Sequence, residues 1–135
     1  MTTEIKNLNY YPKYYSEKYW KRRYRLFSRF DHGIIIDSVE SWYSVTPEAI
    51  AKDQAEHCCD MLRSKNITIL DGYCGIGGNT IQFAKICHKV IAIDIDPIKL
   101  EAAKNNAKIY GVEYKIEFIV GDFFQVAPSI KADVV

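Results

Sequence analysis

The sequence has 135 residues, of which 48% are hydrophobic, and this composition suits one domain with a sizeable core. The 18 lysines and arginines nearly balance the 17 aspartates and glutamates, so the overall charge predicts no polyanionic partner. The uninterrupted apolar runs extend over only a few residues, which excludes a transmembrane helix, and residues 1–13 lack the apolar core of a signal peptide.

The first fifteen residues predict a loosely ordered, tyrosine-rich arm around Pro12. A helix is expected from Ser16, whose hydroxyl suits the N-cap position. Apolar side chains recur in it every three or four residues, which predicts an aromatic face, and basic residues lie between them. The apolar positions are Tyr19, Trp20, Tyr24, Leu26, Phe27 and Phe30, and the basic ones are Lys18, Lys21, Arg22, Arg23, Arg25 and Arg29.

This basic-aromatic segment has two interpretations. Positive side chains between aromatic rings suit contact with phosphates and stacking of bases, as in nucleic-acid binding. Alternatively, the helix is simply amphipathic, with its aromatic residues packed on the core and its basic face in solvent. The segment alone favours the second interpretation.

Residues 31–62 predict a turn, a short apolar run and a helix. The turn is at Asp31-His-Gly33, and the apolar run is Ile34 to Ile36. Thr46 suits the N-cap of the helix, Pro47 its first position and Glu48 its positive end. Its expected buried stripe is Ile50, Ala51, Ala55, Cys58 and Leu62. No metal site is expected at His57-Cys58-Cys59, because consecutive helical residues cannot converge on one ion.

Residues 67–96 predict a βαβ unit that binds a nucleoside cofactor. An apolar strand ends on Asp71, a glycine-rich turn and a helix follow, and a second apolar strand ends on Asp94. The glycines at positions 75, 77 and 78 (Gly75, Gly77 and Gly78) allow the backbone to approach a ligand closely. The amides at the start of the following helix carry a partial positive charge that attracts an electron-rich ligand. Asp94 is placed to accept both hydroxyls of a ribose.

The glycine spacing distinguishes between cofactors. In a dinucleotide fingerprint that starts at Gly75, the third glycine would fall on Thr80, and the extra glycine here is Gly78. With Asp71 before the turn, the segment resembles the cofactor loop of class I S-adenosylmethionine (SAM) methyltransferases. A turn that merely permits tight packing is the weaker interpretation, because a second acid follows at Asp94.

The remaining residues extend the same α/β pattern. A helix is expected from Pro97 to Tyr110 with Gly111 as its stop, and a third strand from Ile116 to Val120. The helix has Ile98, Ala102, Asn105 and Ile109 on one face. Residues 124–131 are expected to be a connector, and residues 132–135 the beginning of a fourth strand.

Several segments together resemble the trimethylguanosine synthase family, which methylates the exocyclic N2 of 7-methylguanosine RNA caps. The similarity covers about positions 10–135. The basic-aromatic segment and Ser44-Val-Thr-Pro-Glu48 single out this family, since the glycine loop alone is generic to SAM enzymes. The matching pieces include Lys18-Tyr-Trp, Arg23-Tyr-Arg-Leu-Phe-Ser-Arg-Phe-Asp31, Asp71-Gly-Tyr-Cys-Gly-Ile-Gly-Gly-Asn79, Val90-Ile-Ala-Ile-Asp-Ile-Asp-Pro97, Asn105-Asn106, Gly121-Asp-Phe123 and Lys131-Ala-Asp-Val-Val135.

The resemblance implies a role for each matching position. The methionine part of SAM would be held by Asp71 and by the loop from Gly75 to Gly78, which includes Gly77. Asp94 would hold the ribose. The adenine would lie against Asp122 and Phe123, while Phe27 and Thr46 would close over the cofactor. Lys18 would contact the cap phosphates, and Asn106 would lie near the methylated guanine. These roles favour function in the basic-aromatic segment.

The implied fold is the first half of a Rossmann-like class I methyltransferase sheet with a helical N-terminal extension. Residues 1–62 would form the arm and extension that close over cap and SAM, and residues 63–135 the SAM-binding half-domain. The implied partners are capped RNA and small ribonucleoproteins, and no contact with a membrane is expected. The protein is expected to be a monomer located in the nucleus or cytoplasm.

The resemblance has one departure. In this family, Lys-Ala-Asp-Val-Val continues into Ser-Pro-Pro-Trp, which supplies the tryptophan under the guanine. The sequence stops at Val135, so the catalytic residues are not assigned, and the chain alone is expected to be inactive or very poor. Two alternatives stay open: another N2-guanine or N6-adenine RNA methyltransferase, and a non-catalytic form that binds cap or SAM.

Overall fold

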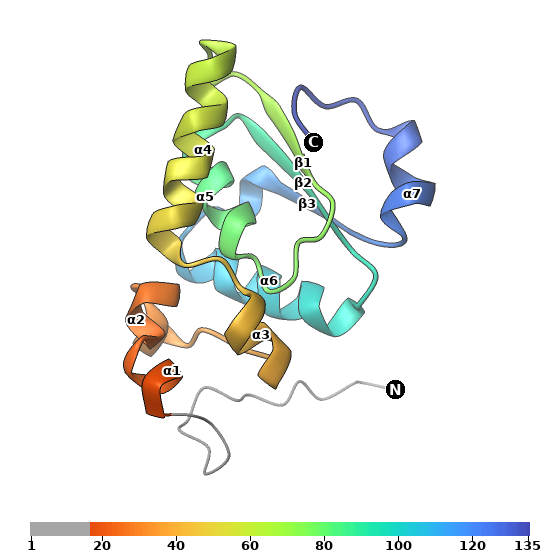
Figure 1. Cartoon of the computed structure of the whole chain (residues 1–135). Helices are drawn as coiled ribbons and strands as arrows, with labels where there is room; N and C mark the ends of the chain where they lie inside the picture. The colour runs from red at the N-terminus through yellow and green to blue at the C-terminus, as the bar shows by residue number, and fades with distance from the viewer. Residues whose placement is uncertain (1–16) are drawn as a thin grey trace.

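The computed structural model describes residues 17–135 (Figure 1). The predicted arm and the Ser16 N-cap lie outside these residues. No helix in this part of the chain is both long and apolar enough to span a bilayer.

The centre of the molecule is a three-stranded parallel sheet. Its strands are β1 (Thr68–Asp71), β2 (Lys89–Asp94) and β3 (Ile116–Val120), in the order β1-β2-β3. Helix α5 (Gly78–Ile86) connects β1 to β2, and α6 (Pro97–Ile109) connects β2 to β3. The α/β class and the partial Rossmann-like sheet predicted from the sequence are therefore confirmed.

The chain crosses to the other side of β1 near its last described residues. Val134 forms a parallel bridge with Ile69, and the Leu70 amide donates to the Val134 carbonyl at 2.8 Å. The expected fourth strand is thus a single bridge, which gives the spatial order Val134-β1-β2-β3. The strand order reverses beside β1, and open parallel sheets bind ligands at the carboxyl ends of the strands at such a point.

The residues between β3 and this bridge include short helices, where the sequence predicted a plain connector. Helix α7 (Phe123–Val126) and the 3-10 turn η3 (Ala127–Ser129) follow β3. They cover one face of the sheet, and α4, α5 and α6 lie on the other side (Figure 1). Because both faces are covered, the strands are almost uniformly apolar.

The single helix expected from residue 16 is wrong in the part that the structure describes. The segment forms α1 (Glu17–Lys21), α2 (Arg23–Leu26) and the 3-10 turn η1 (Phe30–His32). Leu26, Phe27 and Phe30 are all buried, and a continuous helix would point the side chains of Leu26 and Phe27 in directions about 100° apart. The backbone therefore becomes extended at Phe27 (φ −139°, ψ 113°), and Gly33 ends the turn at φ 103°.

The next two helices also differ from the prediction. Helix α3 (Val39–Ser44) was not predicted; the side chain of its N-cap, Ser38, accepts from the Ser41 amide at 3.2 Å. Helix α4 (Glu48–Leu62) has Pro47 in the N-cap position and no side-chain cap, so Thr46 is not its N-cap.

The buried stripes of α4 and α6 are shifted from the predicted ones. In α4, Ala51, Ala55 and Cys59 are buried, whereas Ile50 and Leu62 are exposed. These small side chains allow α4 to lie closely against α5. In α6, the predicted Ile98, Asn105 and Ile109 are only half-buried. The buried set is Leu100, Ala102, Ala103, Asn106 and Ala107.

The N-terminal extension and the sheet share one hydrophobic core. Phe27, Phe30 and Trp42 from the extension belong to the same buried cluster as Ile81 of α5 and Val90 of β2. The extension is therefore packed as part of the described fold.

A polar junction joins α4, the end of α6 and the segment after α2. The Tyr110 hydroxyl donates to Glu48 at 2.6 Å and accepts from the Arg29 amide at 3.2 Å, and the Ser28 hydroxyl donates to Glu48 at 3.0 Å. Burial raises the pKa of Glu48, but the hydrogen bonds from Tyr110 and Ser28 outweigh it and leave the pKa below its usual value of 4.5. Burial and the bond to Glu48 raise the pKa of Tyr110 to about 12.

The Tyr110→Phe substitution tests this junction. The lowered pKa means that ionised Glu48 stabilises the fold above pH 4.5, and that this stability is lost as the pH falls through the folded-state pKa. Removing the hydroxyl should lower the free energy of unfolding at neutral pH by about 1 kcal/mol. The further loss of stability between neutral and acid pH should then be smaller in the variant than in the unchanged chain. Urea denaturation at several pH values measures both. Tyr114→Phe, at a residue 80% exposed, is the control, and equal behaviour of the two variants would contradict the assignment.

Candidate functional site

A cleft of about 460 Å³ opens at the carboxyl ends of β1 and β2. This volume is typical of sites for small ligands. Helix α3 and the residue after it form one side, and the glycine turn, the end of β2 and the start of α6 form the other. The lining residues are Glu40, Ser41, Ser44, Val45, Tyr73, Cys74, Gly75, Ile76, Gly78, Asn79, Asp94, Ile95, Asp96 and Lys99.

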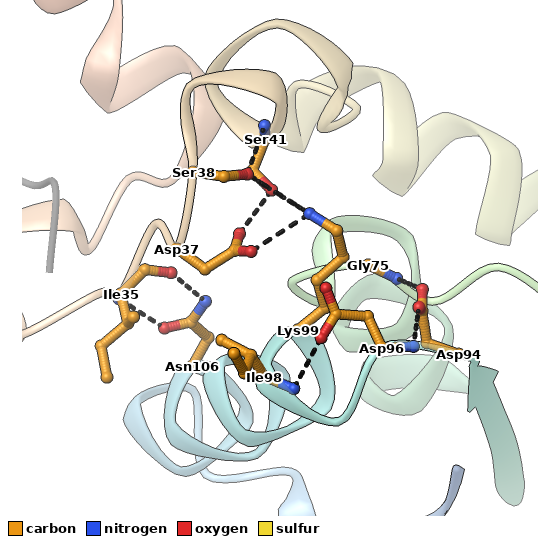
Figure 2. Close-up of polar contacts among 10 residues, drawn as sticks. All are labelled: Ile35, Asp37, Ser38, Ser41, Gly75, Asp94, Asp96, Ile98, Lys99 and Asn106. Carbon is orange, nitrogen blue, oxygen red and sulfur yellow. Dashed lines mark hydrogen bonds and ion pairs between the residues drawn. The ribbon is translucent and has the colours of Figure 1, made fainter. Parts of the chain in front are cut away.

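The Asp94 carboxylate is fixed in this cleft by backbone donors (Figure 2). Its Oδ2 accepts from the Gly75 amide at 2.8 Å, and its Oδ1 accepts from the Asp96 amide at 2.9 Å. Each oxygen keeps a lone pair for another donor. Asp94 can therefore accept two hydroxyl groups of a ligand while it holds the glycine turn against β2.

Three glycines of the turn serve different structural needs. At Gly75 (φ 56°), a Cβ would meet nothing within 4 Å, so this backbone faces open space. Gly77 (φ 94°) is the N-cap of α5, and a Cβ there would lie 3.3 Å from the Cβ of Ala103. At Gly78, a Cβ would approach Val45 Cγ2 to 2.7 Å and the Thr46 carbonyl to 3.1 Å. Gly78 thus allows the segment before α4 to lie on the turn.

Asp71 supports the turn from beneath. Its carboxylate accepts from the Thr80 hydroxyl at 2.6 Å, which ties the end of β1 to the first turn of α5. Burial raises the pKa of Asp71 although the hydrogen bonds from Thr80 and the Tyr73 backbone act in the opposite direction. Asp71 does not line the cleft.

A buried ion pair closes the rim of the cleft beside α3. Lys99 Nζ lies 3.1 Å from Asp37 Oδ2 and donates to the hydroxyls of Ser38 and Ser41 (Figure 2). Only 18% of the Lys99 side chain and 5% of the Asp37 side chain are exposed. This pair was not predicted from the sequence. Asp37-Ser38 is a helix-start signal that could have revealed α3, but nothing local pairs residues that are 62 positions apart.

Asn106 is completely buried, and its side chain forms four hydrogen bonds. Its Oδ1 accepts from the Ile35 amide (2.8 Å) and from Asn105 (3.2 Å), and its Nδ2 donates to the carbonyls of Ile35 and Ile76 (3.0 Å each). The amide therefore has no capacity left for a ligand. This side chain is a structural clamp, and its predicted position near a substrate guanine stays a prediction.

Of the other predicted site residues, the structure brings only some to the cleft. Gly75, Gly78 and Asp94 line it. Thr46 lies against Gly78 through its backbone. Phe27 is 2% exposed and packs in the core, with its ring centroid 6.4 Å from that of Tyr110.

The two predicted residues after β3 lie beside the cleft without lining it. The Asp122 carboxylate caps α7 by accepting from the Phe124 amide at 2.8 Å. The Phe123 ring packs against Gly72, and its centroid is 5.6 Å from that of Tyr73, which lines the cleft. Lys18 is exposed on α1.

Residues 66–135 match the family of RNA cap guanine-N2 methyltransferases. The trimethylguanosine synthase of Schizosaccharomyces pombe is 49% identical over 116 residues, covering 85% of this chain and 47% of that protein. That of Saccharomyces cerevisiae is 42% identical over 99 residues, covering 73% and 31%. The chain thus spans about half of the first relative and less of the second.

A solved structure shows a similar arrangement. The RNA methyltransferase from Salinibacter ruber, in complex with S-adenosyl-L-homocysteine, matches with a TM-score of 0.55 and 29% identity. The match covers 66% of this chain and 57% of that chain.

The Lys99→Met substitution tests the buried pair. Removing Lys99 leaves the Asp37 carboxylate buried without its cation, so the free energy of unfolding should fall by about 3 kcal/mol. Lys89→Met is a matched control, because Lys89 also lies 3.1 Å from a carboxylate, that of Glu117, but both side chains are about half exposed. The control should lose less than about 1 kcal/mol. Similar losses in the two variants by urea denaturation would contradict the assignment.

Proposed function

The chain belongs to the RNA cap guanine-N2 methyltransferase family, and on that premise we propose that it binds SAM in the cleft and supports methyl transfer to the exocyclic N2 of a 7-methylguanosine RNA cap. The observation that carries this proposal is the Asp94 carboxylate, held by the Gly75 amide at the carboxyl end of β2. This is the position in which open parallel sheets bind the ribose of a nucleoside.

The residues of the cleft fit such a cofactor. Asp94 has two free acceptor positions for ribose hydroxyls, and the open backbone at Gly75 leaves room for a close approach. Tyr73 and Ile95, which line the same cleft, are 72% and 71% exposed and offer apolar surface to an aromatic base. We assign the methionine part to the turn Gly75 to Gly78, supported by Asp71, and the adenine to the side of Asp122 and Phe123.

A bound SAM would supply the reactive methyl group on its sulfonium, and the residues of the chain would orient the reactants. Displacement at a methyl carbon depends mainly on placing the attacking amine in line at about 3 Å. The segment Val45–Thr46 lies over Gly78, so the extension covers this part of the glycine turn, while the backbone at Gly75 stays open to a ligand. Phe27 would act in this closure from within the core, and Lys18, exposed on α1, would contact cap phosphates.

The proposal also defines partners and location. An N7-methylated guanine is cationic and is recognised by stacking and cation–π attraction with aromatic rings. We therefore propose capped RNAs as partners, together with the small ribonucleoproteins that contain them. We also propose that the protein is a monomer located in the nucleus or cytoplasm.

The test combines cofactor binding with methyl transfer. Calorimetry with S-adenosylhomocysteine should show binding by the chain and at least about tenfold weaker binding by Asp94→Asn, which loses a carboxylate that accepts two hydroxyls. Methyl transfer from labelled SAM is then compared between two forms of one RNA, one with a 7-methylguanosine cap and the other with an unmethylated cap.

The outcomes separate the candidate functions. Transfer to the methylated cap alone, at a very low rate, is the expected result. Equal transfer to both RNAs would favour another guanine-N2 methyltransferase, and binding without transfer to either would favour a non-catalytic SAM-binding form. Absence of cofactor binding would overturn the proposal.

A further inference from the structure

A second groove, of about 520 Å³, lies on the extension and shares no lining residue with the cofactor cleft. Residues of helices α1, α2 and α3 and of the start of α4 line it. Helix α3 contributes to both: Glu40, Ser41 and Ser44 to the cleft, and Trp42 and Tyr43 to the groove. The groove residues are Tyr19, Arg22, Tyr24, Arg25, Leu26, Trp42, Tyr43, Pro47, Glu48, Ala49 and Ile50.

The aromatic residues of the basic-aromatic segment divide into two groups. Trp20 and Phe30 turn inward and surround Arg23, whose guanidinium carbon lies 4.2 Å from the Trp20 ring centroid. Tyr24 of the segment and Tyr43 of α3 line the groove and are 44% and 51% exposed. The Arg23 guanidinium carbon also lies 4.5 Å from the Tyr24 ring centroid, and the Tyr19 ring meets that of Tyr43 edge to face at 4.5 Å. The amphipathic interpretation thus describes only the inward group, and the exposed parts of the Tyr24 and Tyr43 rings are available to a planar ligand.

The charge of the groove is positive. Arg22 and Arg25 line it one helical turn apart, and both are exposed. Neither takes part in an ion pair within residues 17–135. The one acid among the lining residues, Glu48, is bound to Tyr110 and Ser28. Two exposed guanidinium groups beside accessible tyrosine rings are complementary to phosphates linked to flat bases.

We propose that this groove binds a single-stranded stretch of the RNA substrate, with phosphates on Arg22 and Arg25 and bases stacked on Tyr24 and Tyr43. The choice of RNA rests on the proposed function. The position of α3 between the two sites places this stretch next to the cofactor cleft, so the groove would bind nucleotides that continue from the methylated end.

The test measures binding of a short, uncapped, fluorescein-labelled single-stranded RNA to the whole chain by anisotropy. Arg22→Glu/Arg25→Glu should weaken binding at least tenfold and lower the slope of log affinity against log salt by about 1.4, because two phosphate contacts are lost. Tyr43→Leu should weaken binding about fivefold or more through lost stacking. A matched control, Lys65→Glu/Lys131→Glu, makes the same charge change at exposed residues outside the groove and should bind nearly as the unchanged chain does.

Each other outcome overturns the groove assignment. No binding of uncapped RNA at low salt, or equal losses in the arginine variant and the control, would exclude a dedicated RNA groove. Displacement of the RNA by polyglutamate at equal charge would identify an acidic-peptide site instead. Calorimetry with S-adenosylhomocysteine on the same variants keeps this test separate from the proposed function, since the groove substitutions should leave cofactor binding unchanged.

Discussion

The arrangement of the molecule depends on the buried amide of Asn106. This side chain joins three parts of the chain that are distant in sequence: the segment at Ile35, helix α6 and the glycine turn at Ile76. All four of its hydrogen-bonding positions are used, and losing them would leave backbone groups buried without partners, at a cost of about 1–3 kcal/mol each. The clamp therefore sets where the extension lies relative to the cofactor turn.

Further contacts around this clamp give the cleft its two sides. Lys99 and Asp37 hold the segment before α3 against α6, and Glu48 with Tyr110 holds the start of α4 against the end of α6. Asp94 holds the glycine turn against β2. Helix α6 thus acts as the common support, with the extension on one side and the sheet on the other, and α3 becomes the shared wall of the cleft and the groove.

The sheet and the glycine turn were predictable because their signals are local. Apolar runs ending on Asp71 and Asp94, with glycines between them, define a βαβ unit within 30 residues. The break after Leu26, the helix α3 and the role of Asn106 were not predictable, because each depends on a distant contact. Asn106 meets Ile35 across 71 positions, and an asparagine in a helical pattern has no local mark of burial. The clamp role of Asn106 was therefore not visible in the sequence.

The most direct test of this account is amide hydrogen exchange at Ile35 in the Asn106→Ala variant. The Ile35 amide donates to Asn106 Oδ1, so its exchange should become much faster in the variant, while the Cys74 amide, which donates to Ile93, stays protected. Asn105→Ala removes the bonds to the Gly33 carbonyl and to Asn106 Oδ1 but leaves the bond from the Ile35 amide to Asn106, so this control should leave Ile35 protected. Unchanged protection of Ile35 in Asn106→Ala would contradict the claim that this amide fixes the extension to the cofactor turn.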